Sequence, residues 1–461
     1  MIDQIEKHLE MRKQIRERGI AHRSRILGFI FDQYPEQRKY VEYCLEELRD
    51  VAIILGSARG GTSAFKDTLA ANSAIISMTG EHRLFFTLYG YNFPDHGGYL
   101  EKNPGTFYSE DHLGLILRNI IYDSNASENW YLSNREIELY GWEWAIRLYL
   151  QWPEFEFDSE KVVRIVADRY KKIPGYTQAE IDKFYVDLIN AFRKEFYHKI
   201  SPLYYDFSAN ILEEYKNDEK TVDFYNSRTI IEISPFVLTC PRKIKQIPAR
   251  CPLLLLKASS DCYRIPLLRQ LFKDRNIYFL HLTRNPLSSA NGLIDGWFHP
   301  CFGQHDLSFC KDKFNLENTD PGIDRFMWKF DLLEEWQEHF SKPLEVLCIK
   351  QWMSSHLNIF RELEKINGNE RYCRIPFEDF QKSLDSRAIL YKKVCDYLNI
   401  EYDSFLRDRI EKPRIINATV KPKVQRWKEK RDLLLSLLKC DGVENLCGAL
   451  GYETKNFENW L

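Results

Sequence analysis

The sequence predicts an α/β fold in which a mostly parallel sheet is flanked by helices and carries a large helical insertion. Four short, almost wholly apolar runs predict strands buried on both faces, and each run is followed by sequence of helical spacing; the runs are residues 51–55, 253–256, 277–282 and 344–349. A glycine-rich segment joins the first run to its helix. Residues 96–245 are rich in Trp and Tyr and have helical rather than strand-like spacing.

We expect the chain to be organised in four parts. Residues 1–48 form amino-terminal helices, with Gly19 ending the first of them. Residues 49–95 form the first part of the α/β core, residues 96–245 an insertion that covers the substrate, and residues 246–461 the second part of the core. Within the insertion, Thr177 and Glu180 have the spacing of a capping box and predict a helix start.

The composition argues against several classes of partner. The 461 residues include 65 Lys and Arg against 67 Asp and Glu, and a net charge of −2 is not typical of a nucleic-acid-binding protein. No apolar stretch approaches the roughly 20 residues of a membrane span, and the first residues lack the apolar centre of a signal peptide. The 11 cysteines form no C-x-x-C pair and are expected to be reduced. We expect a soluble, cytoplasmic protein with neither a nucleic-acid nor a membrane partner.

The glycine-rich segment between the first strand and its helix predicts an anion site. Main-chain N–H groups converge in such a loop, and the helix dipole adds positive potential at its amino end. The segment spans residues 56–63, and the residues expected to contact the anion are Ser57, Arg59, Gly60, Gly61, Thr62 and Ser63.

The spacing of this loop is close to that of a nucleotide P-loop, G-x-x-x-x-G-K-[ST], but Thr62 stands where the lysine belongs. A P-loop enzyme pairs that lysine with Mg²⁺ held by a carboxylate at another strand end. Here the run 277–282 continues into Thr283 and Arg284, without a carboxylate. The cation lies within the loop, as Arg59. This arrangement suits a phosphosulfate, whose sulfuryl group carries less charge than a terminal phosphate, bound without metal.

Two segments resemble signatures of the sulfotransferases that use 3'-phosphoadenosine 5'-phosphosulfate (PAPS). Residues 57–63 are similar to their phosphosulfate loop, P-[KR]-[SG]-G-T-[TS], with Ala58 in place of proline, and residues 284–286 match a strand end written R-[DN]-P. The resemblance implies transfer of a sulfuryl group from PAPS to a hydroxyl or amine of a small molecule, such as a specialised metabolite, with no metal. It also implies that Arg284 binds the 3'-phosphate and that Lys257 acts near the bridging oxygen.

Other residues that contact the donor in this family match this chain less closely. The family usually has a serine eight residues after the arginine, but this chain has Gly292, and Ser288, Ser289 or Asn291 would substitute. Residues 374–380 resemble a strand-to-helix element of the family. A basic segment resembles the part that closes over the donor, and its cations are Lys421, Lys423 and Arg426.

The residue that would act as general base matches the family's patterns least well. One branch of the family uses a histidine two residues after the lysine, where this chain has Ser259. Another uses a glutamate shortly after the loop, where this chain has Glu81 followed by His82. The run 74–77 predicts a strand that delivers both residues to the same sheet edge. Glu81 is the first candidate and His82 the second; His299 and His305 come next.

Two other functions are compatible with the same loop. A P-loop kinase or nucleotide hydrolase would require Mg²⁺, and a non-catalytic nucleotide-binding protein would bind the donor product without turnover.

Overall fold

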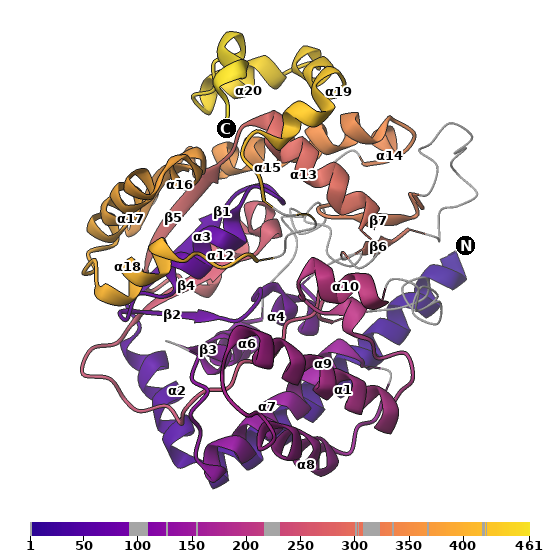
Figure 1. Ribbon diagram of the computed structural model, residues 1–461, viewed down its shortest axis with the longest axis vertical. Coiled ribbons are helices and arrows are strands. Elements are labelled where there is room, and N and C mark those ends of the chain that lie inside the picture. Colours follow the sequence, from indigo (N-terminus) through magenta and orange to yellow (C-terminus); the bar gives the residue numbers. More distant parts are fainter. Residues whose placement is uncertain are drawn as a thin grey trace.

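A computed structural model describes residues 2–91, 109–125, 128–153, 155–215, 231–299, 302, 304–307, 323–333, 336–366, 368–416, 420 and 422–461. In Figure 1 a twisted sheet lies in the middle of the molecule, a mostly helical half lies below it, and the carboxy-terminal helices lie above it. In the same view the helices at residues 286–298 and 344–363 lie at the upper right of the sheet. None of the described helices is long and apolar enough to cross a membrane.

The main sheet confirms the predicted mostly parallel α/β architecture. Its order is β3-β2-β4-β1-β5-β8, and the five strands from β2 to β8 are parallel, whereas the short β3 pairs antiparallel with β2. The strands are β1 (Asp50–Leu55), β2 (Ile75–Met78), β3 (Ser124–Asn125), β4 (Leu253–Lys257), β5 (Asn276–Thr283) and β8 (Glu370–Pro376). The predicted strand at residues 74–77 is β2.

Helices cover both faces of the sheet because alternate strand residues point to opposite faces. Ala52 and Ile54 pack with one set of helices, while Val51, Ile53 and Leu55 pack with the other. The first set is α3 (Thr62–Leu69), α16 (Glu378–Lys382), α17 (Leu384–Leu398) and α18 (Ser404–Glu411). The second set includes α1 (Ile2–Gln33), α2 (Pro35–Glu47), α4 (Arg83–Leu88), α6 (Glu110–Asp123) and α12 (Ile265–Leu271).

The described part of the predicted insertion is mostly helical, apart from β3 and the segment 231–245. Its further helices are α7 (Asn134–Gln151), α8 (Ser159–Tyr170), α9 (Gln178–Glu195) and α10 (Ala209–Tyr215). The capping box before α9 is present: the N–H of Thr177 donates to Glu180 Oε2 at 3.0 Å, and its hydroxyl to the same oxygen at 2.7 Å. Helices α7 and α8 pack closely on each other, and α1 packs along α7 (Figure 1).

The rest of the core surrounds the carboxyl end of β5. It consists of α13 (Pro286–Phe298), the hairpin of β6 (Gln304–Asp306) and β7 (Met327–Lys329), and the helices α14 (Trp336–His339), α15 (Leu344–Leu363), α19 (Arg431–Ser436) and α20 (Val443–Ala449). These elements share one apolar cluster, whose largest side chains include Trp297, Trp328, Trp352 and Trp427.

Two expectations from the sequence are wrong. The run 344–349 is the first part of helix α15 and not a strand, because its apolar side chains continue at helical spacing into Trp352 and Met353 and pack against α13. The remaining parallel strand is instead β8. Gly19 does not end a helix, since α1 continues to Gln33. A Cβ at Gly19 would lie 3.0 Å from Leu88 Cδ1, so this glycine allows close packing inside the helix.

Candidate active site

The loop after β1 is shaped by two residues in the left-handed region of backbone conformation. Arg59 has φ +62° and Gly61 has φ +90°, and Gly61 is the N-cap of α3. The N–H of Gly60 donates to the carbonyl of Ser57 at 3.1 Å, which closes the turn. The first N–H groups of α3 have no acceptor within the helix and are therefore available to an anion at the carboxyl edge of the sheet.

Replacing Gly61 by alanine should disrupt this loop. A Cβ there would lie 2.5 Å from Cζ of Phe377, and the positive φ is unfavourable for any side chain. Backbone strain of this kind costs about 1–3 kcal/mol of unfolding free energy. The control is Gly114→Ala in α6, where a Cβ meets nothing within 4 Å and the helix should gain about 0.5–1 kcal/mol. Denaturant unfolding of both variants measures the difference, and equal stability of the two variants would contradict the loop geometry.

Two half-buried arginines flank one side of the loop. Arg59 Nε donates to the carbonyl of Gly292 at 3.2 Å, and Arg284 Nη1 donates to the carbonyl of Arg59 at 3.1 Å. Burial, with Arg284 nearby, lowers the pKa of Arg59 to about 10, and burial lowers the pKa of Arg284 too. Both side chains remain cationic at neutral pH. Two half-buried guanidinium groups this close together favour a bound anion.

Several polar atoms beside these arginines are buried without a hydrogen-bond partner in the described part of the chain. They are Ser57 Oγ, Arg284 Nε, Ser289 Oγ and Asn291 Oδ1. Leaving a buried donor or acceptor unsatisfied is costly, so such atoms are rare in folded proteins. These four atoms lie in the loop, in Arg284 and in α13, where a bound polar ligand would satisfy them.

The region expected to hold a 3'-phosphate has different contacts from those inferred from the sequence. The hydroxyl of Ser288 donates to the main-chain oxygen of Leu461 at 2.9 Å, and Asn285 Nδ2 donates to the same oxygen at 2.7 Å. Asn291 is buried in α13. At Gly292, a Cβ would lie 3.2 Å from Cβ of Arg59. A side chain at this position would therefore press on Arg59.

Lys257 approaches the other side of the loop from the neighbouring strand β4. Its ammonium donates to Ser63 Oγ at 3.1 Å and to Glu81 Oε1 at 2.5 Å, and Glu81 Oε2 lies 3.0 Å from Arg83 Nε. Burial alone would raise the pKa of Glu81, but Lys257 and Arg83 outweigh burial and lower it to about 2. Glu81 is thus a carboxylate of low basicity as long as both cations contact it.

His82 lies on the interior side of Glu81. Its side chain is fully buried, its Nε2 lies 3.2 Å from Asp261 Oδ1, and its ring packs edge-on against Phe86. Asp261 Oδ2 in turn accepts from the N–H of Ala258 at 2.7 Å, one residue after Lys257. His82 therefore links the turn after β2 to the end of β4.

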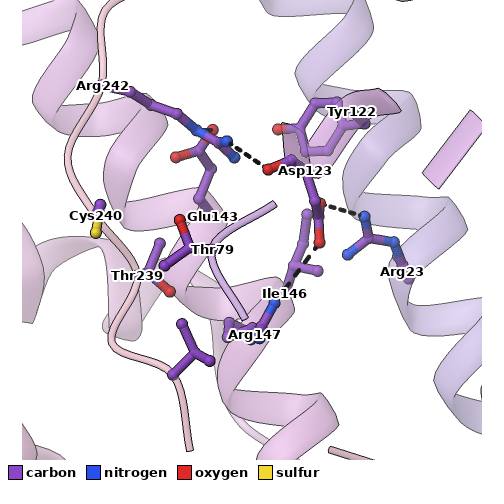
Figure 2. A pocket seen from close by; sticks show the side chains of 11 residues that line it. Arg23, Thr79, Tyr122, Asp123, Glu143, Ile146, Arg147, Thr239, Cys240 and Arg242 are labelled. Atoms are coloured by element: carbon purple, nitrogen blue, oxygen red, sulfur yellow. Dashed lines mark hydrogen bonds and ion pairs between the residues drawn. The ribbon is translucent and has the colours of Figure 1, made fainter. Parts of the chain in front are cut away.

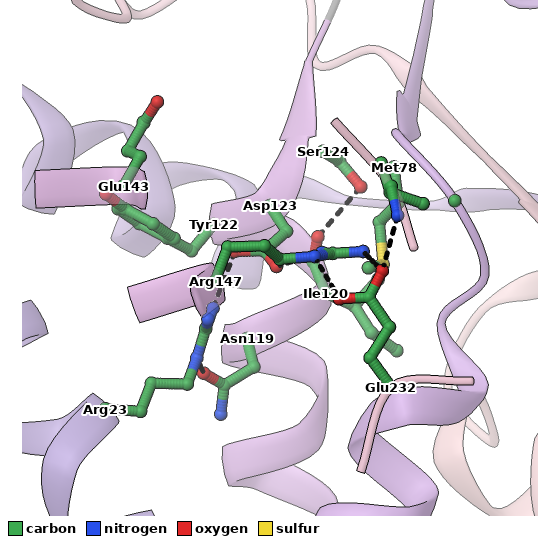
Figure 3. A network of polar contacts seen from close by, with 12 residues as sticks. Arg23, Met78, Asn119, Ile120, Tyr122, Asp123, Ser124, Glu143, Arg147 and Glu232 are labelled. Carbon is green, nitrogen blue, oxygen red and sulfur yellow. Dashed lines mark hydrogen bonds and ion pairs between the residues drawn. The ribbon is translucent and has the colours of Figure 1, made fainter. Parts of the chain in front are cut away.

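A buried network of ion pairs lies next to the turn that follows β2 (Figures 2 and 3). Arg147 Nε lies 2.5 Å from Glu232 Oε2, Arg23 bonds Asp123 at 2.6 Å, and Arg242 bonds Glu143 at 2.7 Å. All of these groups except Glu232 line a cavity of about 40 Å³. Figure 2 shows Thr79, at the end of β2, on the wall of this cavity. A Cβ on the next residue, Gly80, would lie 3.3 Å from Arg147 Nη2. The network supports the turn that presents Glu81.

The predicted basic segment is only partly near the site. Lys421 lies outside the described residues. Lys423 is exposed and pairs with Glu429 at 2.7 Å. Arg426 forms an ion pair with Asp295 in α13, and its charge acts on both Arg59 and Arg284. Of the cations in this segment whose side chains the structure describes, Arg426 is therefore the one positioned to act on a bound donor.

The two histidines that follow in the sequence are near the site but are not cationic. Burial, with Lys329 and Arg59 nearby, lowers the pKa of His299 to about 4. Burial also lowers the pKa of His305 to about 3, and His305 Nε2 donates to the carbonyl of Phe330 at 2.8 Å. His305 is therefore a neutral donor that holds the backbone at Phe330 in place.

Two site residues were not identified from the sequence. Arg83 pairs with Glu81, and Asp331 is buried near both. Arg83 directly follows Glu81 and His82 in the sequence, so it could have been predicted to lie near them. Asp331 belongs to no motif. Among the described residues there is no group of three or more His, Cys, Asp or Glu side chains that could hold a metal ion.

The chain is similar to two solved sulfotransferase structures, at low sequence identity. No family model and no curated protein matches the chain. The sulfotransferase domain from the curacin biosynthetic pathway has a TM-score of 0.34 and 12% identity, over 88% of this chain and 99% of that domain. Sulfotransferase STF9 from Mycobacterium avium has a TM-score of 0.32 and 11% identity, over 93% of this chain and 86% of that protein. These similarities are too low to assign a family or an activity.

Proposed function

We propose that this protein is a sulfotransferase that moves a sulfuryl group from PAPS to a hydroxyl or amine of a small molecule. The observation that carries the proposal is the placement of cations around the loop after β1. The loop lacks the P-loop lysine, yet Lys257 reaches Ser63 Oγ at 3.1 Å from the neighbouring strand. Arg59 and Arg284 lie together on the other side.

Each cation has a distinct role in this proposal. The loop N–H groups and Arg59 hold the phosphosulfate, Arg284 binds the 3'-phosphate, and Lys257 stabilises negative charge that grows on the bridging oxygen. Preorganised charges of this kind are usually the largest contribution to such catalysis. The unsatisfied atoms Ser57 Oγ and Arg284 Nε support a ligand at both ends of this site.

Ligand-induced thermal stabilisation tests the donor site directly. Adenosine 3',5'-bisphosphate, the donor product, should stabilise the protein by about 2.7 kcal/mol at 100 times its dissociation constant, and Mg-ATP should have a much smaller effect. Gly114→Ala, which leaves the site unchanged, should respond like the wild type. Stabilisation by Mg-ATP without any effect of the bisphosphate would overturn the proposal.

The two alternative functions give different outcomes in a turnover assay. Release of the bisphosphate from PAPS should persist in excess EDTA, because the proposed site relies on arginine and lysine. A P-loop kinase or hydrolase would lose activity on chelation and recover it with Mg²⁺. A non-catalytic protein would bind the bisphosphate and release none from PAPS.

A further inference from the structure

The segment after β7 has an unusual backbone that the surrounding residues hold in place. Phe330 has φ +62°, a conformation that is unfavourable for a non-glycine residue and that is enriched at functional sites. His305 Nε2 donates to the carbonyl of Phe330, and Gln351 Nε2 donates to the carbonyls of Lys329 at 2.9 Å and Asp331 at 3.0 Å. These contacts fix where the next side chain, Asp331, is placed.

The carboxylate of Asp331 is buried and has no direct partner among the described residues. The residue is only 2% exposed, and no hydrogen bond or ion pair joins its side chain to the part of the chain that the structure describes. Its main-chain oxygen, by contrast, accepts from Trp328 Nε1 at 3.2 Å and from Gln351. Buried carboxylates are normally paired or hydrogen-bonded, so an unpaired one is rarely retained for stability.

Phe330 and Asp331, which are neighbours in sequence, lie near the two groups of cations that flank the loop. On one side, the ring of Phe330 packs on Phe302 at 5.6 Å, and the guanidinium of Arg59 lies over Phe302 at 5.0 Å. On the other side, Asp331 is within electrostatic reach of the Lys257–Glu81 pair. The titratable and charged groups that act on Asp331, or on which it acts, are Glu81, Arg83, Lys257, Cys262, Tyr263 and Arg264.

We propose that Asp331 is the general base that activates the acceptor. This inference rests on the proposed function. The acceptor oxygen attacks the sulfur atom while its proton passes to the Asp331 carboxylate. A new O–S bond forms, the bond from sulfur to the bridging oxygen breaks, and its electron pair stays on the 5'-phosphate of the departing adenosine 3',5'-bisphosphate.

The proton affinities of the two carboxylates agree with this division of roles. Burial raises the pKa of Asp331 to about 6, although Arg83 and Arg264 act to lower it. Glu81 has a pKa near 2. A general base is most effective when its pKa lies near the working pH. Glu81 accordingly positions Lys257, and Asp331 accepts the proton.

The test compares Asp331→Asn with Glu81→Gln in the full chain. The probes are PAPS with phenol as acceptor and PAPS with water alone, and the release of bisphosphate is followed from pH 5 to pH 9. Asp331→Asn should lower the rate by about 10²-fold or more, remove the loss of rate that the wild type shows below about pH 6, and leave affinity for the bisphosphate unchanged. Glu81→Gln should lower the rate but keep the dependence on pH.

Melting temperature provides a readout that needs no acceptor. A carboxyl whose pKa is raised on folding destabilises the protein when it ionises, so the penalty is absent below about pH 4 and complete above about pH 6. Asp331→Asn should therefore melt higher than the wild type at pH 8, with a difference that vanishes at pH 4.

The outcomes separate the two proposals. Wild-type rates in Asp331→Asn, or a lower melting temperature of this variant at pH 8, would overturn the role of Asp331 while leaving the donor site intact. If the wild-type protein fails to bind the bisphosphate, the proposed function itself is wrong.

Discussion

Replacing Lys257 by methionine is expected to lower the rate of sulfuryl transfer by about 10²–10³-fold, the effect typical of losing one preorganised stabilising group. The methionine keeps the length and apolar packing of the buried stem but removes the ammonium that reaches Ser63. Because the charge on the bridging oxygen grows only as its bond to sulfur breaks, the loss should fall on kcat. Affinity for the bisphosphate should stay close to that of the wild type. Single-turnover release of bisphosphate from PAPS measures the effect.

Lys245→Met is the matched control for this change. Lys245 is also a buried lysine, and its ammonium donates to main-chain oxygens of Ser124 at 2.8 Å and Ile121 at 3.3 Å, away from the loop. Its replacement should lower stability and leave the rate per folded molecule unchanged. Equal loss of rate in both variants would assign the effect of Lys257→Met to folding.

Arg284→Ala should weaken binding of adenosine 3',5'-bisphosphate on the order of 10–100-fold, since a charge-assisted hydrogen bond to an anion contributes about 1.5–3 kcal/mol. Arg284 is half-buried directly after the end of β5, and its buried Nε has no hydrogen-bond partner among the described residues. Isothermal titration calorimetry measures the change. Arg59→Ala, in comparison, should act mainly on the rate, because Arg59 is expected at the sulfuryl end of the donor.

The control for Arg284→Ala is Arg374→Ala. Arg374 lies on the neighbouring strand β8, is exposed, and donates to the carbonyl of Ala449 at 2.8 Å. Its loss should not affect the bisphosphate. An Arg284→Ala protein that binds the bisphosphate as tightly as the wild type does would place the 3'-phosphate elsewhere.

The sequence and the structure agree best where the structure is decided by neighbouring residues. The strand, loop and helix around residues 56–63 could be predicted because buried strands, glycines in turns and helix starts have local signatures. The capping box before α9 was predicted for the same reason. The run 344–349 was misassigned because a short apolar segment fits both a buried strand and a buried helix, and packing of α15 against α13 decides between them.

The sequence by itself determined the α/β class, the glycine-rich loop and the two strand ends that carry Lys257 and Arg284. Only the tertiary structure decided how these groups combine. Lys257 and Glu81 are 176 positions apart and meet because β2 and β4 are adjacent parallel strands. That contact makes Glu81 a weak base. The unpaired carboxylate of Asp331 belongs to no motif. Its pKa depends on its burial and on charges brought together from α4, β4 and the start of α12, and the sum of such charges is a property of the fold.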